Sequence, residues 1–106
     1  MARKPRTRGT DNVLVELGFA DAEELSAKTM LAMKLNALLD AQGLTQSRAA
    51  KVLRMPQPKI SAIRNYKLRG VSLERLMQAL TMLGQRVRIT VSPRRGRSMA
   101  RIDVAA

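Results

Sequence analysis

The sequence contains no cysteine and no histidine, and its only aromatic residues are Phe19 and Tyr66. Disulfides and thiolate chemistry are therefore excluded, and an ordinary zinc site or a histidine-based catalytic triad cannot form. We expect no enzymatic activity, no metal, no cofactor and no small-molecule substrate. The scarcity of aromatic rings also disfavours the base-stacking surfaces of single-strand binders and of many RNA binders.

Long apolar runs are also missing. No stretch approaches the roughly 20 apolar residues of a membrane span, and no apolar segment follows the basic N-terminus as it would in a secretory signal. These absences predict no membrane association and a cytoplasmic location. Positive charge is abundant instead, because 20 Lys and Arg residues against 8 acidic ones give a net charge of +12. This charge predicts a polyanionic partner, with double-stranded DNA favoured.

The chain is expected to form one domain with a basic segment at each end. Residues 1–10 have too few apolar side chains to join a core, which predicts a flexible basic arm. Residues 11–92 predict a single domain of modest size, and residues 93–106 predict a basic tail. A core this small is expected to gain stability from a partner subunit.

Helical signals dominate the predicted domain. A short helical segment from residue 11 is expected to end at Gly18, and Asp21 with Glu24 resembles the capping box of a long first helix. Apolar residues at helical spacing continue that helix to about residue 42. Further helices are expected over residues 45–53, 56–65 and 72–83, with Thr45 and Ser72 as N-caps.

The apolar pattern changes period after the last of these helices. Val87, Ile89 and Val91 alternate with polar residues, which predicts a β-strand over residues 85–92. A lone strand would leave its backbone groups unpaired, so we expect these three residues to form a dimer interface in which the strand pairs with its copy in a twin subunit. The fold class is therefore all-α with one C-terminal strand shared across a homodimer.

Residues 43–63, GLTQSRAAKVLRMPQPKISAI, resemble the Cro/repressor-like (XRE) helix-turn-helix family. The physical demands of the motif are met: Ala50 is small enough for two helices to approach closely, and apolar residues such as Leu53 and Ile60 fix their crossing angle. The resemblance implies a lambda-repressor-like domain of four to five helices, in which the second helix of the pair enters the major groove of DNA.

The resemblance also implies roles for individual residues. Gln57 is the leading candidate for reading a base, because a glutamine amide can bond N6 and N7 of adenine together. The residues expected to read bases are Gln57, Lys59, Ser61 and Ala62. Those expected to hold the DNA phosphates are Thr45, Gln46, Arg48, Arg64 and Lys67.

Within the family, residues 18–22, 57–61 and 83–84 are similar to antitoxin-type regulators such as HigA-like and HipB-like proteins. This implies a sequence-specific repressor that binds a palindromic operator as a dimer and acts as the antitoxin of a type II toxin-antitoxin operon, with a toxin protein as a further partner. Two alternatives remain open: a stand-alone phage-type regulator without a toxin, and a sequence-neutral nucleic-acid-binding protein.

Two positions depart from the family pattern. Arg54 stands in the turn where the family usually has glycine, because the backbone there tends toward positive φ. Arginine is expected to add about 1 kcal/mol of strain, and the turn is expected to be slightly remodelled. Asn65 and Tyr66 follow the recognition helix where a glycine often closes it, and Asn65 is expected to tolerate the left-handed conformation.

Overall fold

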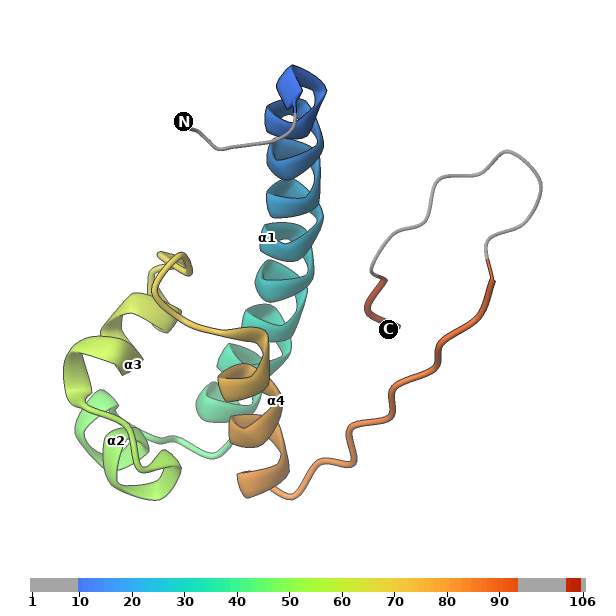
Figure 1. The fold of residues 1–106 in the computed structure, drawn as a ribbon. Helices are drawn as coiled ribbons and strands as arrows, with labels where there is room; N and C mark the ends of the chain where they lie inside the picture. Colours follow the sequence, from blue (N-terminus) through green and yellow to red (C-terminus); the bar gives the residue numbers. More distant parts are fainter. Residues whose placement is uncertain (1–9, 94–102, 106) are drawn as a thin grey trace.

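Four helices make up the described part of the chain (Figure 1). The computed structural model describes residues 10–93 and 103–105, and of residues 10–21 it describes only the helical backbone. The helices are α1 (Thr10–Ala41), α2 (Gln46–Leu53), α3 (Gln57–Arg64) and α4 (Leu73–Met82). The predicted arm, apart from Thr10, and most of the predicted tail lie outside the described residues.

Helix α1 is one continuous helix of 32 residues, so the predicted break at Gly18 and the predicted capping box at Asp21 were wrong. A glycine inside a helix costs only about 1 kcal/mol relative to alanine, and the good helix formers on both sides of Gly18 offset that cost. Asp21 lies in the interior of the helix and cannot act as an N-cap. The fold therefore has four helices in its described part and no separate fifth one.

The core forms where the C-terminal half of α1 meets α4 and α3 (Figure 1). Ala27, Leu31, Leu35 and Leu39 recur every four residues and are all buried, which makes one apolar stripe along α1. The N-terminal half of α1 extends beyond the other three helices (Figure 1). None of the helices in the described part is both long and apolar enough to span a membrane.

Helices α2 and α3 form the predicted helix-turn-helix pair. Thr45 caps α2, because its Oγ1 accepts a hydrogen bond of 3.1 Å from the backbone N–H of Arg48. Ala49 is fully buried in the core, whereas Ala50, predicted to allow the close approach, is partly buried against it. The pair is fixed to the core from both sides, by Leu53 on α2 and by Ile60 on α3.

Helix α4 begins and ends as predicted. Ser72 caps it by accepting a hydrogen bond of 3.0 Å from the Arg75 N–H, and Gly84 follows its end with φ of 85°. The described residues 85–93 then form neither helix nor strand in the single chain. Val87 packs against the core, whereas Ile89 and Val91 are exposed. Because the predicted strand needs a second chain, its pairing stays a prediction.

Candidate DNA interface

One stretch of the sequence concentrates positive charge without any compensating acid. No acidic residue lies between Asp40 and Glu74, and seven basic residues do. They are Arg48, Lys51, Arg54, Lys59, Arg64, Lys67 and Arg69. This stretch covers α2, α3 and the two connections that follow them, so the helix-turn-helix pair presents a positive surface to a polyanion.

The exposed face of α3 carries no charge. Ile60 and Ile63 are buried and fix the orientation of the helix. The opposite face follows from helical spacing and consists of Gln57, Pro58, Ser61, Ala62 and Asn65. Gln57, Pro58 and Asn65 are exposed, whereas Ser61 and Ala62 are partly buried. We call these five residues the reading face.

The reading face presents amide and hydroxyl groups beside small apolar surfaces. The Asn65 side-chain amide donates hydrogen bonds to the Ser61 carbonyl at 2.8 Å and to the Ser61 Oγ at 3.4 Å, which leaves its carbonyl oxygen able to accept. The Gln57 side chain lies in the first turn of α3. Such groups can bond base edges in the major groove, and apolar contacts with thymine methyl groups complement them.

The two cationic residues of α3 lie on either side of the reading face and bond to the protein itself. Lys59 is partly buried, and its Nζ donates to the Gly70 carbonyl at 3.0 Å. Arg64 points the other way, toward α1. We expected Lys59 to contact a base and Arg64 to contact a phosphate, whereas both cations bond within the chain in the structure.

Arg64 joins the end of α3 to α1 through several bonds. Its Nη2 lies 2.6 Å from the Asp40 Oδ1, and its Nη1 donates to the Asn36 backbone carbonyl at 3.1 Å and to the Asn36 Oδ1 at 3.2 Å. Asn36 is itself buried and donates from Nδ2 to the Ile63 carbonyl at 3.1 Å. These contacts fix the C-terminal end of the recognition helix against the longest helix of the fold.

Of the other predicted phosphate contacts, Thr45, Arg48 and Lys67 are exposed and Gln46 is partly buried. The Thr45 oxygen caps α2, but its hydroxyl hydrogen can still donate to a phosphate. Arg48 lies in the first turn of α2, and Lys67 lies in the connection between α3 and α4. All the residues predicted to contact phosphates, except Arg64, are therefore accessible to DNA at the protein surface.

The two departures from the family pattern have different outcomes. Arg54 keeps the left-handed conformation with φ of 56° and ψ of 46°, so the expected remodelling of the turn does not occur and the expected positive φ is confirmed. After α3, the left-handed residue is Tyr66, with φ of 58°, and not Asn65, which has φ of −102°. The Asn65 side chain instead bonds back to the last turn of α3.

Sequence reasoning missed two residues of the reading face. Pro58 and Asn65 were not singled out, although the spacing of the buried Ile60 and Ile63 would have placed them on the opposite side of the helix. The sequence pattern gave no indication of which groups Lys59 and Arg64 would bond. Gly70 and Asp40 lie far along the chain, and only the tertiary fold brings them near.

Comparisons with known proteins agree with this geometry. A family model described as a helix-turn-helix domain matches residues 13–92. Among solved structures, a protein described as an XRE family transcriptional regulator is 50% identical; the match covers 81% of this chain and 98% of the other, with a TM-score of 0.74. No curated protein gives a significant match.

Proposed function

Because the chain belongs to the XRE-type helix-turn-helix family of DNA-binding transcriptional regulators, we propose that it is a sequence-specific repressor acting as a dimer on a palindromic operator. The observation that carries this proposal is the uncharged reading face of α3, surrounded by a stretch of chain with basic residues and no acidic ones. Neutral hydrogen-bonding groups supply sequence readout, and the surrounding cations supply affinity for phosphates.

Base readout is assigned to Gln57, Ser61 and Ala62, with Asn65 added because it lies on the same face. Gln57 is the residue best suited to adenine, since its amide can accept from N6 and donate to N7. Ala62 is small enough to allow the helix to approach the floor of the groove. Each bidentate contact of this kind discriminates against a wrong base by about 1–3 kcal/mol.

Contacts to the DNA backbone are assigned to Thr45, Gln46, Arg48 and Lys67. These residues belong to the start of α2 and to the connection after α3, so they lie at opposite ends of the helix-turn-helix pair in the sequence. Backbone contacts at both ends would fix the orientation of α3 in the groove without reading sequence.

A dimer is proposed to form through residues 85–92. Ile89 and Val91 are 70% and 91% exposed in the single chain, a costly arrangement for β-branched apolar side chains that alternate along an extended segment. Pairing with the same segment of a second copy would cover them and satisfy the backbone groups. The resulting twofold axis would match an operator with inverted symmetry.

An antitoxin role is proposed as well, with a toxin protein bound by the N-terminal part of the chain. Its support is the projection of the first half of α1 beyond the other helices (Figure 1), which presents a helical surface to a partner. Co-expression with the neighbouring reading frame tests this role. A neighbour that is neither toxic alone nor copurified would leave a stand-alone regulator.

Selection of bound DNA from a random pool, followed by footprinting on the selected sequence, tests the repressor proposal. We expect a protected inverted repeat with half-site centres about 34 Å apart, or a multiple of that distance. A sequence-neutral binder would select no repeat and would protect DNA uniformly.

A further inference from the structure

The connection between α3 and α4, residues 65–72, presents Lys67 at the protein surface next to the recognition helix. Two apolar side chains, Leu68 and Val71, are buried and attach the connection to the core. Arg69 lies between them and is exposed. Because Leu68 and Val71 face the core, Lys67 and Arg69 face the solvent. A shift of the connection would therefore also shift these two cations.

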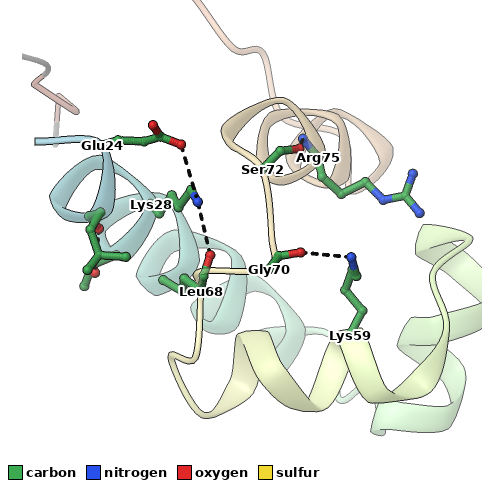
Figure 2. A network of polar contacts seen from close by, with 9 residues as sticks. Glu24, Lys28, Lys59, Leu68, Gly70, Ser72 and Arg75 are labelled. Atoms are coloured by element: carbon green, nitrogen blue, oxygen red, sulfur yellow. Dashed lines mark hydrogen bonds and ion pairs between the residues drawn. The ribbon is translucent and has the colours of Figure 1, made fainter. Parts of the chain in front are cut away.

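Two lysines from different helices bond the backbone of this connection (Figure 2). Lys28 of α1 donates from Nζ to the Leu68 carbonyl at 3.2 Å, and Lys59 of α3 donates from Nζ to the Gly70 carbonyl at 3.0 Å. The two accepting carbonyls are two residues apart. The connection is therefore held between α1 and the recognition helix.

The burial of Lys28 is unusual for a lysine. Only 7% of the residue is exposed, and besides the Leu68 carbonyl its ammonium has the Glu24 carboxylate at 3.4 Å. A buried charge is expensive to desolvate, and an apolar side chain of similar length is often as stable or more stable at such a position. An apolar side chain could not donate to the Leu68 carbonyl, so what the lysine adds at this position is a bond to the backbone of the connection.

The connection begins with a strained backbone turn at Tyr66. Tyr66 has a φ of 58°, a conformation that disfavours any residue with a side chain. Its N–H donates to the Ile63 carbonyl at 3.1 Å, and the next N–H, of Lys67, donates to the Ala62 carbonyl at 2.8 Å. These backbone bonds hold the turn at Tyr66, and the two lysines hold the residues that follow it, at the Leu68 and Gly70 carbonyls.

We propose that Lys28 and Lys59 are positioning residues that hold the connection, and with it Lys67, in a fixed relation to the reading face of α3. Lys59 then acts on DNA binding through the Gly70 carbonyl and not through a base. This inference rests on the proposed DNA-binding function, in which Lys67 contacts a phosphate. It adds that the contact depends on two lysines that bond the backbone of the connection, one from α1 and one from α3.

The first test is made on the free protein and is independent of DNA. In Lys28→Met, the amides of Lys67 and Val71, which bond to the Ala62 and Leu68 carbonyls, should exchange hydrogen about tenfold faster than in the natural protein. The amides of the α1 core should change less. Equal acceleration of all amides would indicate general destabilisation and would overturn the proposal.

The second test measures DNA affinity against salt concentration on the selected operator. The steepness of the plot of log affinity against log salt concentration reports how many phosphates the protein contacts. In Lys28→Met and in Lys59→Met, this steepness should fall by the amount expected for the loss of about one phosphate contact, although Lys67 is intact. Lys67→Met introduced into the Lys28→Met protein should then have little further effect. Lys34→Met, which removes a partly buried α1 lysine with no bond to the connection, is the matched control and should leave the slope unchanged.

The outcomes separate the alternatives. If Lys28→Met and Lys67→Met each weaken DNA binding and the double variant shows the sum of the two effects, Lys28 does not act through Lys67 and the proposal is contradicted. A change in preferred base at one operator position in Lys59→Met would show direct readout by Lys59 and would overturn its positioning role. If the natural protein binds no operator, the proposed function fails, while the exchange experiment still decides whether the two lysines hold the connection. If Lys28→Met does not fold, Lys59→Met still tests the proposal, because the Lys59 bond lies at the protein surface and its loss should not unfold the protein.

Discussion

Two residues other than glycine adopt the left-handed backbone conformation, one just after each helix of the helix-turn-helix pair. Arg54 follows α2 with φ of 56°, and Tyr66 follows α3 with φ of 58°. Each costs about 1 kcal/mol or more relative to glycine. Both are maintained by backbone bonds, from the Arg54 N–H to the Ala50 and Lys51 carbonyls and from the Tyr66 N–H to the Ile63 carbonyl. The fold therefore imposes a left-handed backbone at two residues whose side chains disfavour it.

Arg54→Gly is expected to stabilise the protein. Glycine adopts the left-handed conformation without a steric penalty, and after its larger entropy in the unfolded chain is counted, the gain should be about 0.5–1 kcal/mol. Thermal unfolding should show a midpoint several degrees higher. Arg54→Ala removes the same charge but keeps a Cβ and serves as the control. A glycine variant no more stable than the alanine variant would contradict strain at this position.

Asn36→Ala is expected to destabilise the protein by about 2 kcal/mol. The substitution removes a buried amide that donates to the Ile63 carbonyl and accepts from the Arg64 Nη1. Denaturant unfolding gives the free energy directly. Met33→Ala, at a position of α1 that is 51% exposed, is the control and should change stability by less than about 0.5 kcal/mol. Equal effects of the two variants would mean that Asn36 does not anchor α3.

At the scale of the helices, the sequence predicts three of the four well, because local chemistry decides their ends. Thr45 and Ser72 cap α2 and α4, and the prolines before and within α3 set its start. The start of α1 was mispredicted because Gly18 and Asp21 carry turn signals that the surrounding helix formers override. The apolar face of each helix was predictable from spacing, and with it the reading face.

The bonds between elements were not predictable in the same way. Lys28, Lys59 and Arg64 resemble ordinary surface cations in the sequence, and each bonds a group 11 or more residues away. Helical spacing contains no information on such pairs. The site was therefore predicted at the level of the helix and its exposed face, and not at the level of which cations remain available to DNA.

Thr45→Ala and Ser72→Ala are expected to separate two roles of a helix cap. Each should lower the free energy of unfolding by about 1 kcal/mol, because an N–H of the first turn loses its acceptor. Only Thr45→Ala should also weaken DNA binding by the folded protein, since its hydroxyl can donate to a phosphate. Thermal unfolding and binding to the selected operator measure the two effects. Equal binding by both variants would remove Thr45 from the interface.

At the scale of the molecule, charge and shape divide the chain into two regions. The stretch from α2 to the start of α4 has only basic charged residues, whereas α1 contains both signs, including Glu23, Glu24 and Asp40. The extended segment after α4 exposes Ile89 and Val91. The basic surface is therefore separate from the exposed apolar segment through which we propose that the chain dimerises.

Ile89→Asp is expected to abolish the proposed dimer without unfolding the domain. The side chain is 70% exposed in the single chain, so an aspartate costs little there, but two aspartates brought together by strand pairing would repel. Sedimentation equilibrium at micromolar concentration measures the molecular mass. Thr90→Asp, on the opposite face of the segment, is the control and should remain dimeric. A natural protein that sediments as a monomer, or an Ile89→Asp dimer, would contradict pairing through this segment.

The most direct measurement compares the DNA sequences selected by the natural protein and by Gln57→Ala from the same random pool. If the exposed face of α3 reads bases, the variant should lose its preference at one position in each half-site, at a cost of about 1–3 kcal/mol for the original base, and should keep the remaining pattern. Arg48→Ala should weaken binding to all sequences alike. An unchanged preference at every position in Gln57→Ala, with affinity also unchanged, would contradict the account.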